Sequence, residues 1–204
     1  MNIKISKSIK KLTAGTVIAS VLLTTNAQAR SLLYGMEKQV SLHTTQTSLK
    51  TKVFDEESSQ RFYGGKGSFR VEPKVKGATL GASYNLVGSK TLTRGGMKFE
   101  PTVHSAFIDL GYKSSTRARL VSTVFSLGVG NVVISGDKYD DDIDSGFSSE
   151  STPAAKAAII VDRKFGQFSP WSIQFAAELV RLLENSDVIN SSIYSTSVGI
   201  GYRF

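Results

Sequence analysis

Apolar residues alternate with small or polar residues along much of the chain, which is the two-residue period of β-strands. The alternation is clearest over 194–204, where even positions are mainly Tyr, Val, Ile and Phe, and odd positions are Ser, Gly and Arg. A face of Gly and Ser suits the narrow interior of a membrane barrel whose apolar side meets lipid. The pattern therefore predicts an all-β transmembrane barrel, with a soluble β-sandwich as the alternative.

Eight segments show this alternation and reach the roughly 9–11 residues that a tilted transmembrane strand needs. They are Ser31–Thr44, Arg61–Val71, Lys76–Val87, Phe99–Tyr112, Arg117–Ser135, Ala154–Phe165, Trp171–Leu183 and Val188–Phe204. Bacterial barrels have short periplasmic turns and longer external loops. The expected turns are 72–75, 113–116 and 166–170, and the expected external loops are 45–60, 88–98, 136–153 and 184–187. We therefore predict an antiparallel up-and-down barrel of eight strands with both termini in the periplasm.

Residues 172–184 also fit an amphipathic helix, because they are rich in helix formers and bring Ile173, Ala176 and Val180 onto one helical face. As a strand the same segment alternates regularly as far as Leu179, and Arg181 is the exception. A helix would leave seven strands and put the chain ends on opposite sides of the membrane, which bacterial barrels avoid. We therefore favour a strand, in which pairing with neighbours overrides local propensity.

The first 29 residues are predicted to be a cleaved secretory signal peptide. Four lysines precede an apolar run over 12–23, which is too short for a transmembrane helix of about 20 residues. The segment ends in Ala27-Gln28-Ala29, a small-residue cleavage site before Arg30. Residues 30–204 then form a single barrel domain. It contains 21 basic and 17 acidic residues, so its net charge is +4 instead of the +8 of the full chain. This modest charge gives no reason to expect a nucleic-acid partner.

Residues suited to catalysis or metal binding are few, since the chain has no Cys and only two His, His43 and His104. Disulfides, thiolate metal sites and cysteine nucleophiles are therefore excluded. His104 precedes Ser105, but neighbours in a strand point to opposite faces. We expect no enzymatic activity, no cofactor and no metal site.

Several charged residues fall at positions that face the barrel interior. An eight-stranded barrel is just wide enough for its own side chains, so buried charges have to pair or become neutral. They form either a polar gate or a salt-bridge network that fixes strand register, and we favour the network because nothing in the sequence indicates a continuous channel. The four acids and three bases are Glu37, Asp109, Lys156, Asp162, Lys164, Glu178 and Arg203.

The predicted loop over 136–153 is strongly acidic. Asp140, Asp142 and Asp144 have the spacing of the first ligands of an EF-hand loop. Gly146 and Glu150 each fall one position from the rest of that pattern, and no flanking helices are expected. We interpret the segment as a solvated surface tip, with divalent-cation bridging to lipopolysaccharide or a partner as the alternative. Its acidic residues are Asp137, Asp140, Asp141, Asp142, Asp144 and Glu150.

Aromatic residues gather at the predicted periplasmic rim, where they would form an interfacial girdle. They are Tyr34, Phe69, Tyr112, Phe165, Trp171, Tyr202 and Phe204. The terminal strand Tyr-x-Thr-x-Val-x-Ile-x-Tyr-x-Phe, with Phe as its last residue, resembles that of bacterial outer-membrane β-barrels. In size the chain is similar to the eight-stranded OmpA, OmpX and opacity-type barrels of Gram-negative bacteria. The resemblance implies that Tyr202 and Phe204 are the recognition signal for the barrel-assembly machinery.

The same resemblance implies a location in the outer membrane, in contact with its lipid and lipopolysaccharide. The barrel would anchor external loops that serve envelope integrity and surface contact, such as adhesion, host-factor binding or phage reception. A host surface molecule is then the expected partner. Two alternatives belong to other classes: an outer-membrane enzyme that modifies lipid A, and a narrow porin of low conductance.

Overall fold

The computed structural model describes most of the chain from residue 36 onward, and Glu37–Phe204 form one compact unit. The described residues are 36–51, 58–88, 92–94, 97–116, 120–139, 149–184 and 189–204. The predicted signal peptide, with its cleavage site at Ala27, Ala29 and Arg30, lies outside them. Four acids of the predicted acidic loop also lie outside them, namely Asp140, Asp141, Asp142 and Asp144.

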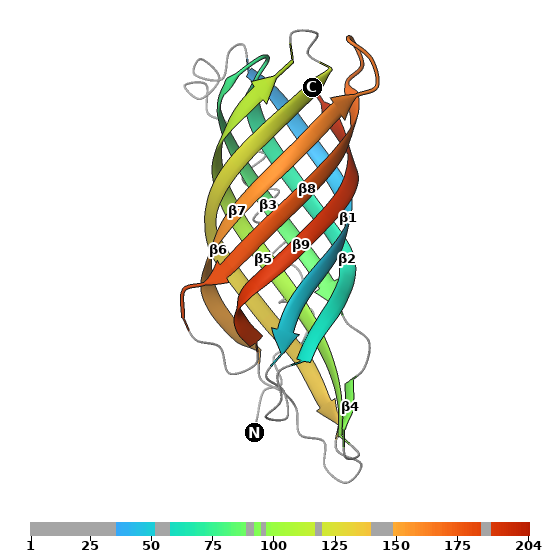
Figure 1. The fold of residues 1–204 in the computed structure, drawn as a ribbon, viewed down its shortest axis with the longest axis vertical. Coiled ribbons are helices and arrows are strands. Elements are labelled where there is room, and N and C mark those ends of the chain that lie inside the picture. The colour runs from blue at the N-terminus through green and yellow to red at the C-terminus, as the bar shows by residue number, and fades with distance from the viewer. Residues whose placement is uncertain are drawn as a thin grey trace, which may run out of the picture. The chain divides into compact units, whose positions relative to one another are not determined.

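Nine strands are described, and eight of them close into an antiparallel barrel (Figure 1). They are β1 (Met36–Thr51), β2 (Ser58–Pro73), β3 (Gly77–Gly88), β4 (Leu92–Arg94), β5 (Met97–Ser115), β6 (Val121–Tyr139), β7 (Glu150–Lys164), β8 (Trp171–Leu182) and β9 (Ile189–Arg203). The order around the barrel is β3-β2-β1-β9-β8-β7-β6-β5, and pairing of β3 with β5 closes it. The short β4 pairs with β5 alone. The predicted eight-stranded antiparallel barrel is therefore confirmed.

The ambiguous segment 172–184 is a strand. β8 pairs with β7 on one side and β9 on the other, so that Glu178 lies opposite both Ala158 and Ser195. Its burial alternates with a period of two, as a strand between barrel interior and exterior requires. Two flanking ladders thus override the helix propensity of its residues. No helix in the described residues is long and apolar enough to cross a membrane.

Several strand boundaries differ from those expected, and the strands are mostly longer. β1 continues to Thr51 instead of Thr44, and β2 covers 58–73 instead of 61–71. The β5–β6 ladder continues to the pair Lys98↔Tyr139. The long external loops expected at 45–60 and 136–153 are therefore wrong in extent, because backbone pairing carries the strands into these ranges. Asp137 and Glu150 lie in strands β6 and β7 instead of in a loop.

Interior glycines let polar side chains fit into this narrow barrel. At Gly201 a β-carbon would lie 2.8 Å from the amide nitrogens of Gln39 and Gln174 and 2.9 Å from Ser172 Oγ. At Gly199 it would lie 2.6 Å from Cγ of the His43 ring. The Gly and Ser face of the terminal strand is thus the interior face, as its alternation predicts.

The beginning of β1 and the end of the chain lie at the same end of the barrel. The backbone groups of Lys38 and Phe204 exchange two hydrogen bonds of 3.2 and 3.0 Å. We call this the C-terminal end, which lies at the top of Figure 1, and the opposite end, where β4 lies, the loop end. That the C-terminal end faces the periplasm stays a prediction.

Candidate functional site

The barrel interior is divided into two parts of different chemistry. Toward the loop end the side chains are mainly apolar, with Thr47 and Thr152 among them, and we call the apolar ones the apolar layer. Toward the C-terminal end and the middle they are mainly charged and polar, apart from a small apolar cluster of Val124, Ile160 and Ala176, and we call the charged ones the charged layer. The apolar layer consists of Phe62, Val87, Val103, Phe107, Val132, Ile134, Ala154, Val180, Leu182 and Ile193. The charged layer consists of Glu37, Lys66, Arg70, Glu72, Asp109, Lys113, Lys156, Asp162, Lys164, Glu178 and Arg203.

Glu72 is the centre of the charged layer at the C-terminal end. Its side chain is 0% exposed. Lys113 Nζ lies 2.7 Å and Arg203 Nε 3.1 Å from its Oε1, while Arg70 Nη1 lies 3.5 Å from its Oε2. Three cations therefore share one carboxylate, and Lys113 and Arg203 tie β5 and β9 to Glu72 of β2 at one defined register.

Further acids complete this end of the network. Asp162 of β7 forms an ion pair with Arg203 and accepts a hydrogen bond of 3.2 Å from Gln39 Nε2. Glu37 lies 3.7 to 3.9 Å from Arg203, Lys113 and Lys164. Because cations and carboxylates alternate in space, every interior charge of this network lies within reach of its opposite.

A second group of charges lies in the middle of the barrel. Glu178 pairs with Lys66, and Lys156 Nζ lies 3.9 Å from the same carboxylate. Lys156 also contacts Asp109 Oδ1 at 2.8 Å. On its other side the Lys156 ammonium lies 4.9 Å from the centre of the Phe107 ring, a cation–π contact. Lys156 therefore marks the boundary between the charged and apolar layers.

His43 is part of this polar interior. Its Nε2 lies 3.0 Å from Ser41 Oγ, and Ser197 Oγ lies 3.3 Å from its Nδ1. The side chain is buried among strands β1 and β9. A histidine enclosed in this way packs and orients its neighbours, and no substrate could reach it without the barrel opening.

In the part of the chain that the structure describes, side chains fill most of the barrel interior. The structure shows two cavities between the interior side chains, of about 10 and 20 Å³. Each is close to the least volume that holds a single water molecule. A continuous aqueous path would need these volumes to be connected through the apolar layer, whose residues Phe62, Val132 and Ile134 are 0% exposed.

The structure places all of the predicted interior charges in the charged layer, and it adds others that the sequence reasoning missed. The additions are Lys66, Arg70, Glu72 and Lys113. Lys66 and Arg70 occupy every second position together with Gly64 and Ser68, so the alternation in the sequence could have placed both on the interior face. Glu72 and Lys113 fell in expected turns, and nothing in their local pattern reveals that the strands continue through them.

His104 and Ser105 lie on opposite faces of β5. The Tyr84 hydroxyl lies 2.6 Å from His104 Nδ1 on the outer face. Ser105 instead lines the interior cavity beside Phe107. The His–Ser pair required for nucleophilic catalysis is therefore not formed by these two residues.

Aromatic residues surround the C-terminal end on the outside. The rings of Trp171 and Tyr202 are 4.8 Å apart in an edge-to-face arrangement, and those of Tyr202 and Phe204 are 6.4 Å apart. Phe204 and Phe165 are 62% and 66% exposed. Trp, Tyr and Phe rings gathered at one level of a barrel are typical of the interface between membrane and water.

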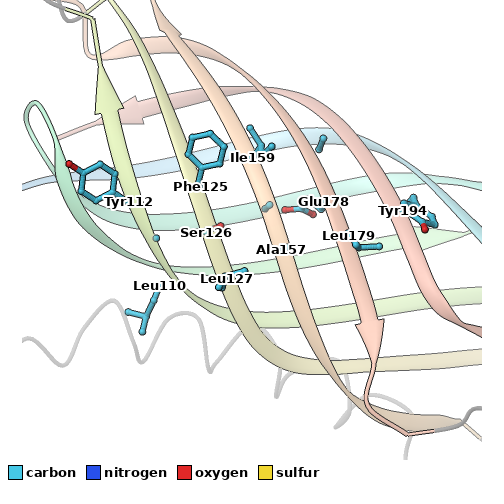
Figure 2. Close-up of a pocket in the computed structure, with 13 residues that line it drawn as sticks. Leu110, Tyr112, Phe125, Ser126, Leu127, Ala157, Ile159, Glu178, Leu179 and Tyr194 are labelled. Atoms are coloured by element: carbon cyan, nitrogen blue, oxygen red, sulfur yellow. The ribbon is translucent and has the colours of Figure 1, made fainter.

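The outer face between the two ends is apolar and carries one broad hollow (Figure 2). Its floor includes the small side chains of Ala157 and Ala177, and its walls include Phe125, Leu127 and Leu179. The hollow measures about 620 Å³. Its position within the exposed apolar surface of β5 to β9 means that hydrocarbon, not water, suits this face.

Comparison with known proteins gives matches among solved structures alone. No model of a known protein family matches the sequence, and no curated protein matches it. Ail, the attachment invasion locus protein of Yersinia pestis, is 15% identical with a TM-score of 0.58 over 82% of this chain and 98% of that chain. Neisserial surface protein A is 12% identical with a TM-score of 0.60 over 83% and 97%. A major outer membrane protein from Thermus thermophilus is 11% identical with a TM-score of 0.55 over 82% and 99%.

A closed barrel with an apolar outer face and a charged interior satisfies its backbone internally and is built to cross a membrane. The matching structures are outer-membrane proteins, and at these identities the likeness is one of fold. The chain is a small eight-stranded barrel of the outer-membrane class. The fold and the resemblance predicted from the sequence are confirmed, and the likeness in fold supports the predicted outer-membrane location.

Proposed function

We propose that this barrel holds the segments at its loop end on the cell surface, where they contact other molecules and support envelope integrity. The observation that carries the proposal is the filled interior. Among the described residues, the interior cavities measure about 10 and 20 Å³ and the apolar layer is tightly buried, which argues against an aqueous path for solutes. The functional part is then what the barrel displays, as is common for rigid scaffolds that position loops.

The porin alternative has less support. A conducting barrel needs a water-filled lumen, and such lumens are found in barrels with many more strands. Here the charged layer resembles an ion channel only in composition, because its ammonium and carboxylate groups pair with each other. The apolar layer adds a second barrier, since ions avoid an apolar constriction.

The enzyme alternative also has less support, and we propose that the chain is not an enzyme. A lipid A-modifying site would need His, Ser and an acid converging on one substrate at the rim. Among the residues that the structure describes, His104 pairs with Tyr84, Ser105 faces inward and His43 is enclosed. None of these histidines has an accessible serine partner.

Strands β5 and β6 project beyond their neighbours at the loop end. Their ladder continues to Lys98↔Tyr139, whereas β6 pairs with β7 only as far as Ile134↔Glu150. Strand β4 adds a third strand to this projection, which lies at the bottom of Figure 1. The backbone of this projection is already paired, so the projection itself loses little conformational entropy when it contacts a partner.

The chemistry of the partner follows from the charge of this segment. From Asp137 to Glu150 the sequence contains six acids and one base. Ail has been solved in complex with a heparin analogue, sucrose octasulfate, which is a polyanion. An acidic segment repels such a ligand, so we propose a host surface molecule with a basic protein surface, or a divalent cation bridge to lipopolysaccharide, instead of a sulfated polysaccharide.

Deletion of 140–148 tests this proposal. The deletion spares Tyr139 and Glu150, the ends of β6 and β7, so the barrel should fold. A folded barrel is expected to run at different positions on SDS gels with and without boiling, which verifies folding of the variant. We expect binding of the expressing cells to a panel of host cells and basic matrix proteins to be lost. A matched deletion of 185–187, in the β8–β9 connection, should leave binding intact. Equal binding by the 140–148 deletion and the intact protein would overturn the proposed contact segment.

The predicted assembly signal is a separate proposal. Tyr202 and Phe204 lie on the outer face at the C-terminal end, where the barrel-assembly machinery could reach them. Deleting Phe204 is expected to slow assembly and lower the yield in the outer membrane. Replacing the equally exposed Phe165 by alanine is the control, because it removes an aromatic ring at the same level without changing the terminal strand. Normal yield after deletion of Phe204 would contradict the signal.

A further inference from the structure

The exposed charged side chains at the C-terminal end are all basic among the residues that the structure describes. Lys74 and Lys76 lie in the exposed turn between β2 and β3, Arg163 lies on the outer face near the end of β7, and Lys38 is half-buried at the start of β1. We call these residues the basic rim. Within the described ranges, none of these side chains forms an ion pair, so their charge is available to an external partner.

The acids at this end are turned inward. The side chains of Glu72 and Asp162 are 0% and 1% exposed, and Glu37 is 23% exposed. All of them are committed to the cations of the charged layer, namely Arg70, Lys113, Lys164 and Arg203. This segregation leaves the outer surface at the C-terminal end positive, whatever the balance of charge inside.

The basic rim lies at the level of the aromatic residues. Lys38 is bonded through its backbone to Phe204, which is exposed. Arg163 pairs in register with Ile173, two residues from Trp171 along β8. Tyr and Trp rings settle at the headgroup level of a bilayer, so cations beside them meet lipid phosphates.

The basic rim is also spread around the barrel. Its residues come from β1, from the β2–β3 turn and from β7, and β8 and β9 separate β7 from β1 on the shorter path. A single docked protein would cover one side, whereas a lipid leaflet surrounds the barrel completely. The distribution therefore favours a ring of small anionic ligands.

We propose that the basic rim binds the headgroups of anionic phospholipids, of the phosphatidylglycerol class, in the leaflet at the C-terminal end. Each cation attracts a phosphate, while the adjacent aromatic rings keep the barrel at the depth where this contact forms. The inference goes beyond the proposed surface contact and depends only on the barrel crossing a membrane.

The test measures which lipids the folded barrel retains. The protein purified from outer membranes is reconstituted into vesicles of phosphatidylcholine and phosphatidylglycerol, extracted gently, and its retained lipids are quantified by mass spectrometry. The variant is Lys74→Gln/Lys76→Gln/Arg163→Gln. The matched control, Arg61→Gln/Arg181→Gln, removes exposed cations at the loop end. Gel mobility with and without boiling verifies that every variant is folded.

The wild type is expected to retain phosphatidylglycerol in preference to phosphatidylcholine, and less so at high salt. Each cation removed should lower that preference about fivefold at low salt, the factor that corresponds to about 1 kcal/mol. The control should match the wild type.

An unchanged preference in the triple variant, or an equal loss in the control, would overturn the proposal. Capture of an anionic protein that depends on the basic rim, with lipid retention unchanged, would also overturn it. No binding partner of the loop end enters this assay, so its outcome is independent of the proposed surface contact.

Discussion

The charged layer and the apolar layer fill the same narrow barrel by different physical means. In the apolar layer Phe62, Val132 and Ile134 gain from leaving water, and any neighbour of suitable shape serves. In the charged layer Glu72 is stable only because Arg70, Lys113 and Arg203 surround it. The apolar layer therefore closes the barrel interior to water, whereas the charged layer makes one strand register more stable than its alternatives.

The largest effect is expected when the charged layer loses its central carboxylate. Glu72→Gln keeps the shape of the side chain but leaves Lys113, Arg70 and Arg203 around a neutral amide. The free energy of unfolding should fall by about 3–5 kcal/mol, as for other buried pairs that lose one partner. Urea unfolding in vesicles, followed by the fluorescence of the single tryptophan, Trp171, measures this change.

Glu184→Gln is the matched control, because Glu184 is exposed at the end of β8. It should change the free energy of unfolding by no more than about 0.5 kcal/mol. If the substitutions at Glu72 and Glu184 cost the same, the charged layer does not depend on specific partners and the contrast with the apolar layer fails.

A smaller effect is expected from adding one methyl group to the charged layer. In Gly201→Ala the new β-carbon would lie 2.8 Å from Gln39 Nε2 and Gln174 Nε2, so these amides have to move. The expected loss is about 1–3 kcal/mol. At Gly88 of β3 no atom lies within 4 Å of an added β-carbon, and Gly88→Ala should be neutral or stabilising. Equal unfolding midpoints for the two variants would contradict this difference.

In the apolar layer the corresponding change is milder. Ile134→Val removes one methylene from a side chain that is 0% exposed, and the expected loss is about 1 kcal/mol. Ile200→Val, on the outer face at 53% exposure, makes the same deletion where lipid fills the space. It should cost less in the same urea assay. A larger loss at Ile200 than at Ile134 would show that the apolar layer is not packed as tightly as its burial indicates.

The sequence predicts the architecture well because barrel strands have a simple period. Each strand has one face toward lipid and one toward the interior, so alternation gives seven strands and a candidate eighth. The even strand number of bacterial barrels then identifies β8 despite its helix propensity. Gly201 and Ser197 could be assigned to the interior on the same ground.

The site is predicted less completely, since pairing across the interior depends on contacts between distant strands. Parity puts Asp162 and Arg203 inside, but it does not show that they form a pair. Glu72 and Lys113 were missed because the ladders continue through positions that resemble turns. The extent of a strand depends on what its neighbours can pair with, and a single sequence does not contain that information locally.

The smallest change in the free energy of unfolding is expected when an ion pair of the charged layer is replaced by apolar side chains. This substitution is also the sharpest test of the difference between the charged and apolar layers. Lys66 and Glu178 pair at the boundary, and Lys156 keeps Asp109 as its partner without them. Lys66→Met/Glu178→Met should change the free energy of unfolding by no more than about 1 kcal/mol, because two desolvated charges are replaced together by packed apolar groups. Each single substitution should cost about 3–5 kcal/mol, since it leaves the other charge buried without its partner. The double-mutant cycle measures this coupling. If the two single losses simply add in the double variant, the coupling energy is zero, and Lys66 and Glu178 are stabilised by other groups instead of by each other.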